Sequence, residues 1–274
     1  NNVLPFNGRR IAMIGLFVLI LFCVIAVFGP FLCPYSYSEI NWNTINQAPS
    51  VKHWFGTDNL GRDIFARVVY GLRITLTVGM LSALISLALG VVYGGISGLA
   101  GGWLDNIMMR IVDILYSIPP LIYVILLMVL LEPGLKNVII VLGVTLWLDM
   151  ARIVRGQILS LKEQDYILAA RSMGTDSFGI LVKHLLPNTR GPILVTLVSS
   201  VQNGIFSETF LSFIGLGITA PMASLGVLAS EGLITLAIHP WQLGFSALVI
   251  SVCILALNFL GNGLQSALDP RMRK

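Results

Sequence analysis

The few polar side chains that interrupt long apolar runs are the residues of this sequence best placed to do chemistry. Gln202, Asn203 and Glu208 lie within the apolar stretch 192–215. A carboxylate in such a stretch is costly to bury and usually faces an aqueous cavity or a partner. We therefore predict that these three residues line a pathway for a polar solute. The alternative is that Glu208 lies near the outer surface and pairs with an arginine or a backbone group.

Enzymatic chemistry has no comparable basis in the sequence. The phosphate-binding pattern G-x-x-x-x-G-K-[ST] does not occur, so the chain is not expected to bind ATP in the usual way. His53, His184 and His239 are too scattered for a metal site, and no base accompanies Ser207 or Ser212. We expect no catalytic residue, no metal and no cofactor. Basic and aromatic residues are not interleaved, so no nucleic-acid partner is expected either.

The elements that position these residues must be membrane helices. The chain has 274 residues, of which 56% are hydrophobic and only 11% are charged. A soluble domain carries about 25% charged residues, because water must wet its surface. The composition therefore predicts a membrane protein.

Six apolar segments reach or approach the roughly 20 residues that a helix needs to cross a bilayer. They are 11–32, 74–97, 111–131, 138–153, 192–215 and 243–263. The third contains Pro119 and Pro120, which interrupt backbone hydrogen bonds and predict a kink. The expected fold class is an all-α polytopic membrane protein with six transmembrane helices.

Charged residues near two of these segments stand three positions apart. Asp149 and Arg152 form one such set, and Arg110 and Asp113 form the other. This spacing permits an ion pair across one helical turn. We expect these residues to anchor helix ends at the inner surface, and a role in gating is the alternative.

The distribution of positive charge predicts the orientation. Twelve of the seventeen lysines and arginines fall on the side of the N-terminus, and such an excess marks the cytoplasmic side. Both termini are therefore expected in the cytoplasm. The expected order is a cytoplasmic segment at 1–10, a first transmembrane helix at 11–32, an extracytoplasmic loop at 33–72, a transmembrane core at 73–263 and a cytoplasmic tail at 264–274.

Two loops are long enough to carry structure of their own. In the outer loop, apolar residues share a face at helical spacing and predict an amphipathic helix on the membrane surface; they are Ile64, Phe65, Val68 and Val69. In the inner loop, 155–190, helix-favouring residues run from 160 to 173. Gly174 follows, where a helix C-terminus tolerates positive φ.

A second helix is expected after this glycine. Thr175 or Asp176 can cap its start, its apolar face consists of Phe178, Leu181 and Leu185, and Pro187 is expected to end it. A helix–turn–helix of this kind is suited to a groove in another protein. An ordinary amphipathic cytoplasmic loop is the alternative from pattern alone.

The inner loop resembles the EAA loop of ABC-importer permeases. The resemblance rests on residues 165–174 and 184–188, where the chain keeps Ala169, Ala170, Gly174, Leu186 and Pro187. It departs at Leu168, where the family usually has Glu, and at His184, in an Ile position. The resemblance implies that the ATPase-coupling residues are Asp165, Tyr166, Ala169, Ala170, Arg171, Gly174, His184, Leu186 and Pro187.

Five further segments are similar to the C-type subunit of dipeptide, oligopeptide and nickel permeases. They are 53–65, 101–105, 152–157, 211–217 and 268–271. The resemblance implies a type I ABC importer permease fold with cytoplasmic coupling helices, in a bacterial cell membrane. It also implies a B-type permease partner, two ATPase subunits that hold ATP and magnesium, and an extracytoplasmic substrate-binding protein.

The substrate and the class of transporter have alternatives. Residues 217–224 look most like oligopeptide permeases, which favours oligopeptides or dipeptides. Nickel, metal-chelate complexes or glutathione are alternatives within the family. An ion-coupled secondary transporter is the alternative from another class. It would carry its coupling site near mid-membrane, often on broken helices, and only Glu208 and the Pro119–Pro120 pair hint at one.

Overall fold

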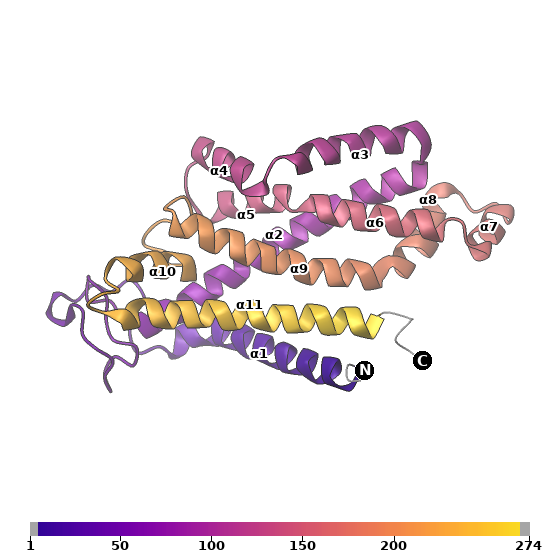
Figure 1. The fold of residues 1–274 in the computed structure, drawn as a ribbon. Coiled ribbons are helices and arrows are strands. Elements are labelled where there is room, and N and C mark those ends of the chain that lie inside the picture. Colours follow the sequence, from indigo (N-terminus) through magenta and orange to yellow (C-terminus); the bar gives the residue numbers. More distant parts are fainter. Residues whose placement is uncertain (1–4, 269–274) are drawn as a thin grey trace.

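The computed structural model describes residues 5–268, and helices make up most of that range (Figure 1). The long helices are α1 (Pro5–Leu32), α2 (Ile64–Ala100), α3 (Gly102–Ser117), α6 (Trp147–Leu161), α9 (Leu186–Phe213) and α11 (Pro240–Leu268). The shorter ones are η1 (Trp42–Thr44), α4 (Pro120–Leu130), α5 (Leu135–Thr145), α7 (Asp165–Ser172), α8 (Ser177–Ile180) and α10 (Leu225–Ile234). A π-helical segment, η2 (Leu181–Leu185), joins α8 to α9. The all-α fold class is confirmed.

Helix α2 is the centre of the bundle, because small side chains let its neighbours approach closely. It has 37 residues, which is about 55 Å of helix, and α6, α9, α5 and α1 pack along it. Gly90, Gly94 and Gly98 recur every four residues where α6 crosses, and a Cβ added at Gly94 would meet the backbone of Ala151. Small residues at this spacing allow close helix packing within a membrane.

Helix α1 lies at the periphery of the molecule, against α11 and α2 (Figure 1). Most of its described side chains are exposed, including Phe17 at 68% and Phe28 at 59%. Gly15 brings α1 close to the backbone of α11 at Ala256. A helix that exposes large apolar side chains along its length is suited to contact with lipid tails.

The two ends of the bundle differ (Figure 1). The loop between α1 and α2 lies at one end together with α10 and the start of α11. The start of α1, the end of α11 and the short helices α7 and α8 lie at the other end. The two ends of the described chain therefore share a side with the 155–190 loop.

The number of membrane spans differs from the expected six. Four helices within the described residues are long and apolar enough to cross a membrane: Arg10–Leu32, Ile64–Ala100, Leu135–Leu161 (α5 and α6 together) and Pro240–Ala267. The bent pair α3–α4 would make a fifth. Helix α9 covers the expected fifth segment but is not among these, because polar residues such as Gln202, Asn203 and Glu208 lower its hydropathy.

The expected third span is not one helix. Helix α3 ends at Ser117, α4 begins at Pro120, and their axes are bent by 83°. Proline disfavours the α conformation for the residue before it, and Ile118 and the first proline, Pro119, are both extended in ψ. The consecutive prolines thus produce a full break rather than the expected kink.

The prediction of a separate amphipathic helix in the outer loop is wrong. Residues 64–72 are the first turns of α2, which continues without a break to Ala100. The Asp63 side chain caps this start by accepting a hydrogen bond from the Ala66 N–H at 2.8 Å. The residues opposite the apolar face are buried as well, including Ala66 and Arg67, because Arg67 has carboxylate partners within the protein.

The first and last helices are longer than the sequence predicts, and part of each expected terminal segment lies outside the described residues. Helix α1 begins at Pro5, within the expected 1–10 segment, and α11 continues to Leu268, past the expected 263. Residues 1–4 and 269–274, with most of the 268–271 motif and half of the expected tail, lie outside the described residues.

Candidate functional site

The turn after α7 is built as the sequence predicts. Gly174 has φ +87°, and its N–H donates to the carbonyl of Arg171 at 3.0 Å. The next N–H, that of Thr175, donates to the carbonyl of Ala170 at 3.1 Å. This pair of bonds is the Schellman ending of a helix, which needs a left-handed residue at the glycine position. Gly174 is therefore required by the backbone.

The segment after this turn differs from the expectation. Asp176 occupies the N-cap position of α8, although its side chain accepts no capping hydrogen bond. Pro187 does not end a helix, because it lies in the first turn of α9, where a missing N–H costs little. The five-residue π-helical segment η2 lets the chain pass from α8 into α9 without a loop.

The α7–η2 segment has one buried side and one exposed side. Ile167 is fully buried and Ala170 is 3% exposed. Ile167 belongs to a cluster of buried apolar side chains with residues of α6, α8 and η2, namely Met150, Val154, Ile158, Ile180, Leu181 and Leu185. Phe178, expected on the same face as Leu181 and Leu185, is instead 70% exposed. Met173 is 81% exposed, so two large apolar side chains stand at the free end of this element.

The residues expected to couple to an ATPase are distributed over both sides. Ala170 is buried, and Leu186 and His184 are half-buried. The remaining ones are exposed: Asp165, Tyr166, Ala169, Arg171, Gly174 and Pro187. Leu168, in the position where the EAA pattern has Glu, is 49% exposed. The exposed members form a surface without a partner inside the described chain.

Glu208 lies in a closed hydrogen-bond network. Its side chain has no exposed surface, and it accepts hydrogen bonds from Ser212 Oγ at 2.7 Å and Thr75 Oγ1 at 3.1 Å. Each hydroxyl accepts in turn from a backbone N–H, that of Ile218 for Ser212 and that of Leu225 for Thr75. Glu208 therefore joins α2 and α9 to the segment before α10 and to the first residue of α10, and in this conformation it reaches no surface.

The other two expected pathway residues lie apart from this network. Gln202 is half-buried and Asn203 is exposed on α9. Neither shares a hydrogen bond with Glu208 in the described structure. The three polar residues of one apolar run thus do not form one site.

Charged side chains of α3 and α6 pair between helices rather than within them. Arg152 Nη2 donates to Asp113 Oδ1 at 2.7 Å, and its guanidinium lies 4.1 Å from the centre of the Tyr116 ring. Tyr116 Oη donates to Asp149 Oδ1 at 3.0 Å. The ion pairs that the spacing permits within each helix therefore do not form; Arg152 pairs with Asp113 of the other helix. The sequence shows the charges, but the partner across α3 and α6 follows only from the fold.

A second ionic contact links the first turn of α3 to the second half of α6. Arg155 donates to both oxygens of Asp105, at 2.5 and 2.7 Å, and Ser97 Oγ donates to the same carboxylate. A bidentate pair fixes geometry as well as charge. It joins two of the segments that resemble permeases, 101–105 and 152–157, directly before α7.

The 53–65 motif at the opposite end encloses a buried ionic cluster. Asp58 Oδ2 accepts from Arg62 Nε at 2.7 Å and from Arg67 Nη1 at 2.6 Å. Both arginines also contact Glu231 of α10. His53 Nδ1 lies 2.8 Å from Asp63 Oδ2. We refer to Asp58, Arg62, Arg67 and Glu231 as the outer ionic cluster; it binds the loop to α2 and α10.

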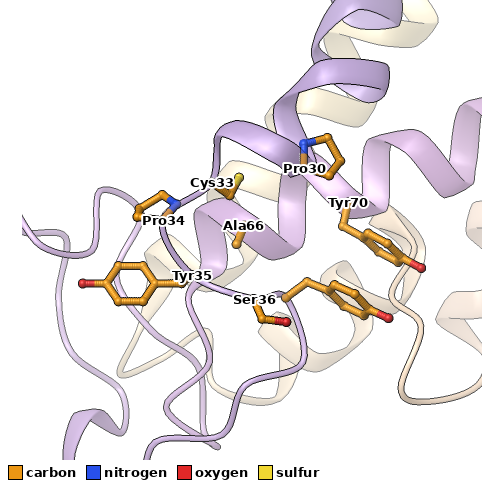
Figure 2. A pocket seen from close by; sticks show the side chains of 8 residues that line it. Pro30, Cys33, Pro34, Tyr35, Ser36, Ala66 and Tyr70 are labelled. Atoms are coloured by element: carbon orange, nitrogen blue, oxygen red, sulfur yellow. The ribbon is translucent and has the colours of Figure 1, made fainter.

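A shallow depression lies beside this loop (Figure 2). It measures about 350 Å³ and is lined by Pro30, Cys33, Pro34, Tyr35, Ser36, Tyr37, Ala66 and Tyr70. The rings of Tyr37 and Tyr70 stack at 3.7 Å. Burial and the nearby charge of Asp63 raise the pKa of the Cys33 thiol above its usual range. The depression is open and has no convergent polar groups, so it defines no binding site by itself.

Comparison with known proteins decides the family. Residues 90–274 match the family model described as "Binding-protein-dependent transport system inner membrane component". The chain belongs to this family. Residues 6–49 of this permease match a second model, the "N-terminal TM domain of oligopeptide transport permease C". The predicted resemblance to C-type permeases is confirmed, and the chain is a multi-pass membrane component.

Two curated relatives cover nearly the whole permease. The dipeptide transport system permease protein DppC of Bacillus subtilis is 53% identical over 97% of this chain and 83% of its own length. The oligopeptide transport system permease protein OppC of Escherichia coli is 40% identical over 98% of this chain and 89% of its own length.

A solved structure has the same fold. A chain of the MetNI methionine ABC transporter in an inward-facing conformation matches with a TM-score of 0.58, covering 74% of this permease and 96% of that chain, at 18% identity. This supports the type I importer permease fold and, at that identity, nothing more specific.

Proposed function

We propose that this permease is one transmembrane half of an ATP-driven importer of dipeptides or oligopeptides. The support is the 53% identity to a dipeptide permease and 40% identity to an oligopeptide permease, each over almost the whole chain. A B-type permease would form the other half. Two ATPase subunits would bind ATP with magnesium and hydrolyse it, and an extracytoplasmic binding protein would deliver the peptide.

The observation that carries the coupling role is the two-sided α7–η2 segment. Ile167 lies in a buried cluster with side chains of α6, while Phe178 and Met173 project from the segment without a partner in the described chain. An apolar helical tip on a rigid base is suited to a groove in another protein. Closure of the ATPase pair would move this tip, and α6 and α9, which continue from its two ends, would carry the movement into the bundle.

The proposed orientation places the ATPases at the end of the bundle that holds α7 and α8. The start of α1 and the end of α11 lie at that same end (Figure 1). Both termini would then be cytoplasmic, in agreement with the excess of lysine and arginine on that side.

The test is to reconstitute the complete complex in liposomes. The complex consists of this permease and the subunits encoded by the neighbouring genes. We expect ATP-dependent uptake of a labelled dipeptide. Met173→Asp combined with Phe178→Asp should abolish uptake and release the ATPase subunits, because two charges would enter an apolar contact. Val51→Asp, at a site 94% exposed in the loop at the other end, is the matched control.

Three outcomes would count against the proposal. Uptake of nickel or glutathione, but not of a dipeptide, would show that the proposed substrate is wrong. Uptake driven by a proton or sodium gradient without ATP would change the class of transporter. Unchanged coupling in the α7–η2 variant would remove the role proposed for that segment.

A further inference from the structure

The break between α3 and α4 is an unusual structure for a lipid-facing surface. All eight residues from 113 to 120 are exposed in this chain, and the chain turns by 83° there. Backbone that leaves the helix at membrane depth is tolerated only where protein covers it or where it lines a water-filled cavity. Lipid tails therefore cannot be the environment of this break.

The side chains around the break point to the same conclusion. Asp113 and Arg152 form an ion pair whose side chains are 57% and 38% exposed. Asp149, also exposed, receives a hydrogen bond from Tyr116 and has no cationic partner within 4.0 Å among residues 5–268. Ionised groups within transmembrane segments face a partner or an aqueous cavity.

Asp149 and Arg152 lie inside a candidate membrane span rather than beyond its end. Asp149 is the fifteenth residue of the 27-residue span Leu135–Leu161. At 1.5 Å per residue, it is about 20 Å from either end of that span. A hydrocarbon core of about 30 Å, centred on this span, would enclose both Asp149 and Arg152.

Water fits this surface better than a tight protein contact. Asp113, Asp149 and Arg152 carry one net negative charge when all are ionised. Arg110, one turn before Asp113, forms no ion pair within 4.0 Å with either carboxylate in the described residues. Enclosing the net negative charge in a dry interface would be costly without a further cation. A hydrated path leaves the acid solvated, and it offers a carboxylate to a passing cation.

We propose that the α3–α4 break and the facing part of α6 line the translocation pathway, and that Asp149 receives the ammonium group of a passing peptide there. The peptide as ligand rests on the proposed function. Tyr116 positions the Asp149 carboxylate, while Asp113 holds Arg152 away from it. Glu208, which is buried, is not part of this wall.

Water accessibility of the break tests the pathway without reference to any substrate. In the complete complex, with Cys23, Cys33 and Cys253 replaced by alanine, Ser117→Cys should react with a charged, membrane-impermeant methanethiosulfonate in the nucleotide-free or the ATP-vanadate state. Ile20→Cys on α1, a site 54% exposed on the lipid-facing periphery, is the control and should not react. A position in lipid does not react, because a thiolate forms only in water.

Failure to react in both states would overturn the pathway proposal. If Ser117→Cys then reacted after the partner permease was dissociated, the break would be a subunit contact instead. This labelling does not depend on transport, so a complex that took up no peptide would contradict the proposed function and leave the accessibility result intact.

Variants of Asp149 test its role in the pathway. We expect Asp149→Asn to lower dipeptide uptake about fivefold, the effect of a partly solvated charge pair, and Asp149→Glu to retain it. The ATPase rate stimulated by the loaded binding protein and the melting temperature should be the same in both variants. Wild-type uptake in Asp149→Asn, or an equal loss of melting temperature and uptake, would overturn the assignment.

Discussion

Glu208 shows how far a single residue can be interpreted from the sequence. Its position in an apolar run identifies it as exceptional, and the structure agrees that it has a specific environment. That environment comes from Thr75, 133 positions earlier in the chain, and from two backbone N–H groups relayed through hydroxyls. No local pattern contains this information, so the expected exposure to a pathway could not be distinguished from burial.

The network predicts an order of stability among Glu208 variants. Glu208→Leu removes both acceptors and leaves two buried hydroxyl protons unpaired, at a cost of about 1–3 kcal/mol each. Glu208→Gln keeps one carbonyl acceptor, so its loss should be about half as large. Melting of the solubilised complex should rank wild type above Gln and Gln above Leu. Ser199→Ala, at an exposed site on α9, serves as control. A Leu variant that melts with the wild type would contradict the network.

At the scale of elements, prediction succeeded where one residue controls the backbone. Gly174 requires a left-handed conformation and is found in one. The prediction that Pro187 ends a helix is wrong, because proline is compatible with the first turn of a helix as well as with its end. The π-helical segment η2 supplies the connection. The start of α2 was misplaced because its polar residues, such as Arg67, are paired inside the protein rather than wetted outside it.

The contact between α2 and α6 depends on small residues, and two adjacent glycines provide a matched test. A Cβ at Gly94 would collide with the backbone of Ala151, whereas a Cβ at Gly95 would lie 3.7 Å from Leu181, an ordinary contact. We expect Gly94→Ala to destabilise by about 1–3 kcal/mol through overpacking. Gly95→Ala should be neutral or stabilising by about 0.5–1 kcal/mol through its helix propensity. The melting temperatures of the two variants measure the difference.

The Gly94 variant should also affect function, because α6 leads directly into α7. A displaced α6 would carry Arg155 away from Asp105, and the bidentate pair would be lost. We expect dipeptide uptake per ATP hydrolysed to fall in Gly94→Ala and to remain normal in Gly95→Ala. Equal coupling in both variants would show that the movement of α6 is not transmitted through this contact.

At the scale of the whole molecule, composition alone predicted a helical membrane protein, and the structure agrees. The number of spans could not be predicted from composition, because α9 is less apolar than a lipid-exposed helix and α3–α4 is broken. Composition also could not predict which helices pack against each other. The sequence gives no reason for α1 to pack on α11, at the opposite end of the chain, since both are simply apolar.

The outer ionic cluster is the clearest long-range relation, because it joins parts of the chain 164 residues apart. Asp58 lies in the loop, Arg67 in α2 and Glu231 in α10, and Arg67 is only 2% exposed. Asp58→Asn would leave two buried guanidinium groups to share Glu231. Breaking a buried ion pair from one side costs about 3–5 kcal/mol, because the remaining charge is uncompensated.

A double variant separates this charge effect from a loss of shape. Asp58→Asn should lower the melting temperature of the complex strongly, and adding Arg67→Met should recover part of the loss by removing the stranded charge. Glu39→Gln, an exposed acid in the same loop, should change nothing. If the double variant lost as much stability as the two single variants added together, the two residues would act independently and not as a pair. The loop would then be held in place by its other contacts, such as that of Gln242 in α11 with the Thr57 carbonyl.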